Sequence, residues 1–132
     1  MISIFDLFSI GIGPSSSHTI GPMKAAKIFI EKLSKKQFSN TTYLVIEVFG
    51  SLAFTGEGHG TDKAILMGME GEDPTTIDPD SVDDRIAHII ESKTLNLNNT
   101  KKIKFNKELH FIFNKADQLP LHTNAMRFKA FS

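Results

Sequence analysis

Five consecutive residues near the amino terminus carry hydroxyl or imidazole groups and precede a predicted helix: Ser15, Ser16, Ser17, His18 and Thr19. Free backbone N–H groups and the helix dipole favour anions at a helix amino terminus, and hydroxyls add hydrogen-bond donors. The segment therefore predicts a site for a small anion such as a carboxylate, although one capping Ser or Thr in an ordinary loop would explain the same spacing. A phosphate loop fits poorly, because no Gly-Lys-Ser/Thr follows the glycines.

A second candidate site surrounds His59, which lies between Gly58 and Gly60 after a predicted strand. Glycine neighbours leave room for a ligand, and an imidazole with an ordinary pKa near ~6.5 can act as a base at neutral pH. Asp62 could orient the imidazole. The alternative is a flexible loop with an exposed histidine and an acidic first helical turn.

The sequence positions of the other three histidines indicate structural roles or a turn. His88 lies beside the apolar stripe of a predicted helix, His110 alternates in a predicted strand, and His122 follows a Leu-Pro-Leu turn. No pair has zinc-ligand spacing and no acidic cluster has calcium-loop spacing, so we expect no metal held by this chain alone. Dinucleotide binding is also unsupported, because no Gly-x-Gly-x-x-Gly stretch opens a helix after a strand.

Composition narrows the class of protein. The 132 residues suit one domain, 1–132, and 15 basic residues balance 15 acidic ones, which gives no basic surplus for nucleic acid. The chain has no cysteine, so it cannot supply a disulfide or a thiolate ligand. Neither a signal peptide nor a run of ~20 apolar residues is found, so we expect a cytoplasmic protein without a membrane segment.

Hydrophobic periodicity predicts the elements that must position the two candidate sites. A short helix over residues 4–8, capped by Ser3, leads in, and an amphipathic helix starts between 18 and 22 and runs to 33. A central strand over 42–50 precedes a glycine loop, and the helix of 61–69 is capped by Thr61 or by the residue before it. A third helix spans 80–91 with Val82, Ile86, Ile89 and Ile90 inward.

The last third of the chain predicts a polar turn at 96–99 and strands at 102–106, 109–114 and 124–131. Because the chain stops inside the last strand pattern, we expect it to continue in a longer protein. The elements together predict an α+β fold, with a mixed, mostly antiparallel sheet packed against about three helices.

Long stretches of the sequence resemble bacterial iron–sulfur L-serine dehydratases. They are the opening residues 3–8, the run Gly-Ile-Gly-Pro-Ser-Ser-Ser-His-Thr and its continuation (11–25), and residues 49–64 and 119–126, in the family's order. The resemblance covers essentially the whole chain and is loose between 77 and 115. It identifies the chain as the amino-terminal β domain of such an enzyme.

The resemblance implies an enzyme that converts L-serine to pyruvate and ammonia, with a second, catalytic domain whose cysteines hold a [4Fe-4S] cluster. The cluster would act as a Lewis acid on the substrate hydroxyl. In that picture residues 15–19 grip the substrate carboxylate, His59 is the general base, and Thr61 and Asp62 support His59 from behind. The partners would be L-serine, the iron–sulfur domain and a second copy in a homodimer, and this chain alone should be inactive.

A different class of function stays open. The family's β domain resembles the effector-binding domain of some phosphoglycerate dehydrogenases, which implies a regulatory module that senses serine or another small molecule, or that forms the dimer contact. Replacing His59 separates the two readings, because only a catalytic base is needed for turnover.

Overall fold

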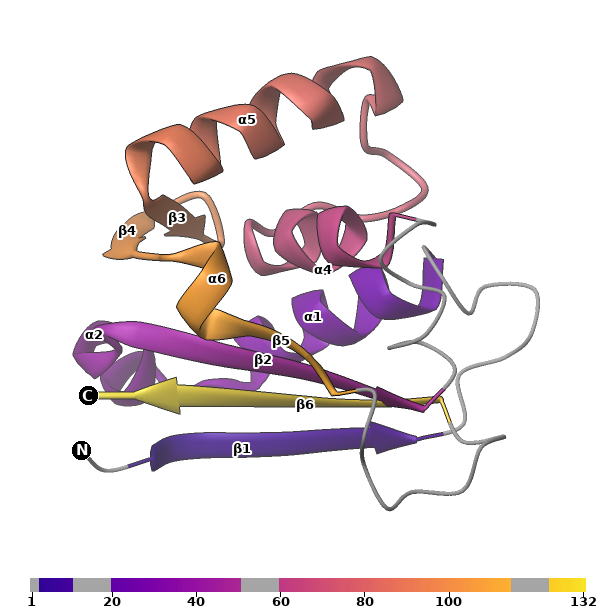
Figure 1. Cartoon of the computed structure of the whole chain (residues 1–132). Coiled ribbons are helices and arrows are strands. Elements are labelled where there is room, and N and C mark those ends of the chain that lie inside the picture. The colour runs from indigo at the N-terminus through magenta and orange to yellow at the C-terminus, as the bar shows by residue number, and fades with distance from the viewer. Residues whose placement is uncertain (1–2, 11–19, 51–59, 115–123) are drawn as a thin grey trace.

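The computed structural model describes residues 3–10, 20–50, 60–114 and 124–132. A four-stranded sheet forms one side of the molecule, and the helices lie against it, with α5 on the far side of α4 from the sheet (Figure 1). The described helices and 3-10 turn are α1 (Ile20–Lys32), α2 (Lys35–Asn40), α4 (Thr61–Met69), η2 (Pro79–Ser81), α5 (Val82–Ser92) and α6 (Lys107–His110). The fold is therefore α+β, as predicted.

The sheet has the order β1 (Ser3–Ile10), β6 (Asn124–Phe131), β2 (Tyr43–Gly50), β5 (Phe111–Asn114). Strand β6 runs antiparallel to both neighbours, whereas β5 runs parallel to β2. A separate hairpin joins β3 (Thr94–Leu97) and β4 (Lys101–Lys104). The mostly antiparallel sheet and the interior position of β2 confirm the sequence prediction.

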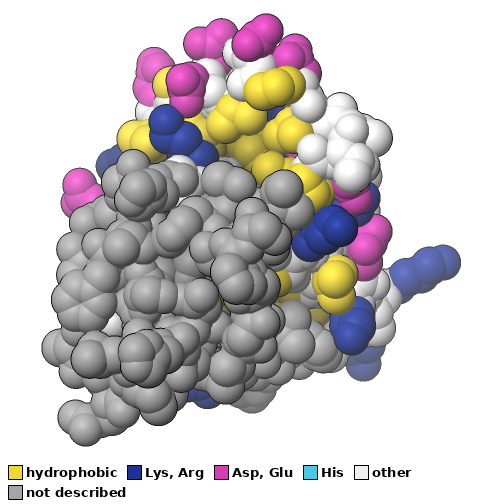
Figure 2. All heavy atoms as spheres, turned by 90° about the vertical axis from the view of Figure 1, so that its right-hand side faces the viewer, with side chains coloured by type: hydrophobic (Ala, Val, Ile, Leu, Met, Phe, Trp, Pro, Cys, Tyr) yellow, Lys and Arg dark blue, Asp and Glu magenta, His cyan; other side chains and the backbone are white. Residues whose placement is uncertain are grey.

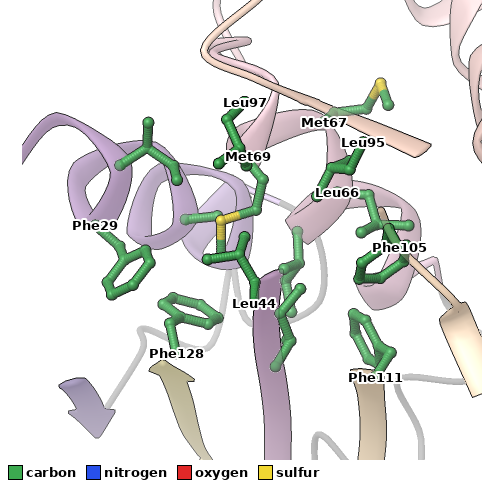
Figure 3. Close-up of a cluster of buried hydrophobic side chains, with 14 of the residues drawn as sticks. Phe29, Leu44, Leu66, Met67, Met69, Leu95, Leu97, Phe105, Phe111 and Phe128 are labelled. Carbon is green, nitrogen blue, oxygen red and sulfur yellow. The ribbon is translucent and has the colours of Figure 1, made fainter. Parts of the chain in front are cut away.

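One face of the sheet forms the floor of the core. Alternate residues of β2 and β6 are buried there, as a strand period of two requires: Leu44, Ile46, Val48, Met126, Phe128 and Ala130. Helix α1 contributes Phe29, whose ring lies 5.5 Å from that of Phe128 (Figure 3). Leu66, Leu95 and Phe105 extend the same cluster to α4 and the hairpin. This core fixes α1 and α4 relative to the strands.

Helices α1 and α4 approach each other very closely at Gly68. A Cβ atom built on Gly68 would collide with the backbone carbonyl of Met23 and lie 2.8 Å from the Cβ of Ala26. Only a residue without a side chain permits this contact, so the glycine is required for packing rather than for its backbone conformation.

Several predicted elements are confirmed at their places. Helix α1 begins at Ile20, within the predicted window, and α4 covers 61–69. The strand predicted for 124–131 is β6, and the third helix corresponds to η2 and α5. Ile90, predicted to point inward, is instead 47% exposed.

The opening segment is a strand, so the predicted helix capped by Ser3 was wrong. Apolar residues at 4, 5, 7 and 8 suit one helical face, but a helix of one or two turns is marginal on its own. Pairing with β6 from Ser3 to Ile10 satisfies the backbone instead. A long-range partner therefore overrode the local pattern.

The boundaries in the last third also differ from the prediction. Strand β4 ends at Lys104, and the single-turn helix α6 separates it from β5, which begins at Phe111. Asn96 belongs to β3 rather than to a turn. Helix α2 was not predicted, although Ser34 and Gln37 form a capping box that is readable from the sequence.

Candidate functional site

Three strands finish at the same end of the sheet, and two of them, β1 and β2, lead toward the predicted site residues. Ile10 of β1 pairs with Ala125 of β6, Gly50 of β2 pairs with Asn124, and Phe49 pairs with Asn114 of β5. We call this end, where β1, β2 and β5 finish and β6 begins, the carboxyl end of the sheet. The hydrogen-bonded register thus brings one end of each of the four strands together there.

The predicted anion-binding residues and the predicted base follow those strands. Ser15, Ser16, Ser17, His18 and Thr19 come between β1 and α1, and His59 comes between β2 and α4. All six residues lie outside the described residues, so their roles stay predictions. His122, between β5 and β6, lies outside them as well.

The start of α4 is described, and it contains both predicted supporting residues. Gly60 is the N-cap with φ +79°, a left-handed conformation that favours glycine, and its Cβ position is open space. Thr61 is fully buried, and among the described residues its Oγ1 is the one buried side-chain polar atom without a hydrogen-bond partner. An unpaired buried hydroxyl is costly, which makes Thr61 a polar group ready for a ligand or a partner.

Asp62 forms an ion pair with a residue far away in the sequence. Its side chain is 10% exposed, and Oδ2 accepts a hydrogen bond of 2.5 Å from Nζ of Lys107 in α6. Its Oδ1 accepts the backbone N–H of Lys63 at 2.9 Å. The carboxylate therefore joins the first turn of α4 to α6, a link that sequence reasoning did not predict.

The structure holds α6 at both of its ends. Asn106 caps it by accepting the N–H of Glu108 at 3.0 Å, and the N–H of Asn106 donates to Nδ1 of His110 at 3.0 Å. The His110 ring stacks on Tyr43 of β2 with centroids 5.5 Å apart, and burial lowers its pKa. His110 is thus structural, as predicted, but it ends a helix rather than alternating in a strand.

A second ionic cluster ties α5 to the chain that follows α4. Arg85 donates to Glu72 at 2.6 Å and to Glu70 at 2.8 Å, and the other oxygen of Glu70 accepts the N–H of Asn96 at 3.0 Å. Burial opposes the charge of Arg85, but the hydrogen bonds to Glu72 and Glu70 outweigh it and raise the pKa of the guanidinium. These groups line a surface pocket of about 490 Å³ together with the exposed His88.

Acidic side chains gather around the start of α5, at the top of the face in Figure 2. Asp80, Asp83 and Asp84 are exposed in the first turns of η2 and α5, where negative charge suits the helix dipole. Lys63 of α4 pairs with Asp83 at 2.9 Å. These charges suit the start of α5, and Asp83 connects it to α4.

The chain cannot supply the thiolates of an iron–sulfur cluster, and its described residues offer no other metal site. The sequence has no cysteine to supply thiolates. The described residues also contain no group of three His, Cys, Asp or Glu side chains that could hold a metal ion. Within the same residues, no helix has the length and apolar character needed to cross a membrane.

The described elements define an α+β domain with a mixed, mostly antiparallel sheet, and comparison with known proteins identifies its family. A model of the serine dehydratase beta chain matches residues 3–132. The chain therefore belongs to the serine dehydratase beta chain family.

Individual relatives agree with this assignment. The chain is 48% identical over 132 residues to an L-serine dehydratase of Haemophilus influenzae and 46% identical over 132 residues to L-serine dehydratase 2 of Escherichia coli. It is 45% identical over 131 residues to an L-serine dehydratase of Streptomyces coelicolor. Each alignment covers 98% of this chain and 29% of the relative, so the chain spans less than a third of the length of these proteins.

Proposed function

We propose that this chain is the β domain of an L-serine ammonia-lyase and contributes substrate-binding residues and a general base to a cleft shared with an iron–sulfur catalytic domain. The observation that carries the proposal is the common end of β1, β2 and β5, which their register with β6 and with each other defines. The chain leaves this end toward residues 15–19 and toward His59. Segments distant in sequence can therefore contribute to one site.

In this proposal Ser15, Ser16, Ser17, His18 and Thr19 bind the carboxylate of L-serine. Their support is chemical, because α1 begins at Ile20 directly after them and a helix amino terminus favours an anion. The hydroxyls would replace the hydration shell of the carboxylate and orient the substrate. An oriented substrate keeps its α C–H bond pointed at the base, which is where positioning lowers the barrier.

His59 is the proposed base that removes the α proton of L-serine. A neutral imidazole accepts the proton on one ring nitrogen, and a hydrogen bond to the other nitrogen sets its orientation. Gly60, Thr61 and Asp62 follow His59 directly, and the described first turn of α4 gives that part of the chain a fixed continuation. Loss of the β hydroxyl then yields aminoacrylate, whose hydrolysis gives pyruvate and ammonia.

Departure of the hydroxyl belongs, in this proposal, to the partner domain. The relatives are more than three times as long as this chain, which leaves room for a cysteine-bearing domain that holds a [4Fe-4S] cluster. The present chain lacks thiolates and should show no dehydratase activity alone. A homodimer of the complete enzyme is part of the proposal.

One experiment tests the proposal against a purely regulatory domain. His59→Ala is introduced into the complete dehydratase that carries this domain, and turnover of L-serine is followed by pyruvate formation. Removal of a general base typically costs about 10²- to 10⁴-fold in rate, so we expect kcat to fall by at least about a hundredfold. The exposed His88 provides the matched control, because His88→Ala should leave kcat unchanged. A His59→Ala enzyme within a few-fold of wild type would contradict the catalytic assignment and favour the regulatory module.

A further inference from the structure

We infer that Lys107 is a positioning residue for the proposed base: through Asp62 it holds the first turn of α4, which continues directly from His59. The inference rests on the proposed function of His59. It assigns a role in the reaction to a lysine 48 positions further along the chain than the proposed base, on a different element.

The contact between Lys107 and Asp62 lies in a mostly buried environment. The side chains are 31% and 10% exposed, and Nζ lies 2.5 Å from Oδ2. Charged hydrogen bonds in such surroundings are screened less than surface pairs, and removal of one partner leaves a charge without compensation. The surface pair of Lys63 and Asp83, with side chains 46% and 83% exposed, lacks this property. Asp62 thus has a specific partner that fixes where its carboxylate lies.

Lys107 itself starts from an anchored backbone. Helix α6 is capped by Asn106, its last residue His110 stacks on Tyr43 of β2, and β5 follows immediately in parallel pairing with β2. The backbone from which the Lys107 side chain extends is therefore held in place relative to the sheet. The ion pair of Lys107 with Asp62 in turn holds the first turn of α4 relative to α6.

The first turn of α4 receives no hydrogen bond from an N-cap side chain. Its N-cap is Gly60, which has no side chain to accept a hydrogen bond from the first turn. Glycine in a left-handed conformation is also a flexible junction, because it can adopt many backbone angles. The Lys107 link compensates for both properties from outside the helix. Without it, the chain would enter α4 with less definite geometry next to the proposed base.

The test uses the complete dehydratase with the variants Lys107→Met, Asp62→Asn and Asp62→Asn/Lys107→Met. Small displacements near a reacting group can cost up to about a hundredfold in rate. We expect Lys107→Met to lower kcat by roughly tenfold, while KM for L-serine changes by less than about threefold. Because Lys107 acts through Asp62, the double variant should resemble Asp62→Asn alone instead of showing the product of both losses.

The pH profile gives a readout that simple destabilisation would not move. Removing the ammonium leaves the carboxylate of Asp62, three residues after the proposed base, without its compensating charge, and a negative charge close to an imidazole raises the pKa of that imidazole. The acid limb of kcat/KM should therefore shift to higher pH in Lys107→Met. The exposed Lys104 of β4 is the matched control, and Lys104→Met should leave kcat and the acid limb unchanged. Thermal unfolding of every variant normalises the rates to folded enzyme.

The outcomes separate this inference from the proposed function. If His59→Ala is inactive while Lys107→Met and the double variant keep kcat within twofold and an unshifted acid limb, the positioning role is wrong and the base assignment stands. If His59→Ala keeps wild-type turnover, both the base assignment of His59 and the positioning role of Lys107 are wrong. Should Lys107→Met fail to fold, the double variant, which buries no unpaired charge, decides: the tenfold loss in kcat supports the inference and a twofold change overturns it.

Discussion

The close contact between α1 and α4 predicts that Gly68→Ala destabilises the protein, although helix propensity alone predicts the opposite. Alanine is about 1 kcal/mol more favourable than glycine inside a helix. At Gly68, however, the new Cβ would collide with the carbonyl of Met23 and approach the Cβ of Ala26 to 2.8 Å. The sign of the effect therefore shows which of the two contributions dominates.

The magnitude follows from what can move. The nearest obstacle is a backbone carbonyl inside α1, which cannot change rotamer, so the two helices must separate. Overpacking of this kind costs about 1–3 kcal/mol, and the upper end applies to a rigid obstacle. Subtracting the propensity gain leaves a net loss of about 2 kcal/mol. With an unfolding entropy of about 2.1 cal/mol/K per residue, 132 residues give a drop in Tm of roughly 7 °C.

Thermal and urea unfolding of the 132-residue chain, followed by circular dichroism, measure this loss directly. Ala87→Gly on the exposed face of α5 is the control, because it changes helix propensity without a packing contact and should cost about 1 kcal/mol. An increase in the Tm of Gly68→Ala, comparable in size to the loss in the control, would refute the proposed packing of α1 on α4.

Two further predictions concern charged groups. Arg85→Met should lower the free energy of unfolding by about 3 kcal/mol, the low end for a broken buried pair, because the carboxylate of Glu70, which is 10% exposed, loses its charged partner. The surface variant Lys63→Met should lose less in the same urea titration. Burial lowers the pKa of His110, so below pH ~6.5 the unfolded chain binds a proton more readily than the folded chain does. The contribution of His110 to stability should therefore be complete above pH ~6.5 and should decrease as the pH falls below that value. His110→Asn keeps an acceptor for the N–H of Asn106 but cannot titrate, so its Tm should change less between pH 7 and pH 5, and an unaltered slope would show that other groups govern acid stability.

Local sequence patterns correctly predicted the elements whose tertiary contacts favour the same secondary structure as the local pattern does. Strand β2 and helix α4 have strong β and helical patterns, and their burial follows the expected periods. Strand β1 was missed because its short apolar pattern suits either structure, and only pairing with β6, more than a hundred residues later, decides between them. Helix α6 was missed because a single turn has almost no periodicity. Its Asn106 cap is the main signal that could have indicated it.

The candidate site, like the fold, was predicted from the sequence only in part. Residue chemistry singled out residues 15–19 and His59, and β-strand register supports a common end for the strands that precede them. Asp62 was predicted to support the base, but its pairing with Lys107 could not be predicted, since it depends on the tertiary position of α6. The Arg85 cluster was missed for the same reason. Contacts between elements that meet only after folding leave no spacing signal in one sequence.

The elements around the carboxyl end of the sheet are held together by backbone register, by helix packing and by an ion pair. Backbone register holds the ends of β1, β2 and β5 at fixed spacing, and a sheet in a packed core resists displacement. Helices α1 and α4 are locked together at Gly68, while Lys107 connects α4 to α6 and thereby to β5. Both helices that follow the proposed site segments are thus tied to the rest of the fold. If the chemistry is shared with a second domain, these ties would let the β domain present its proposed base and carboxylate-binding groups in a constant geometry, and weakening either tie should reduce turnover before it unfolds the protein.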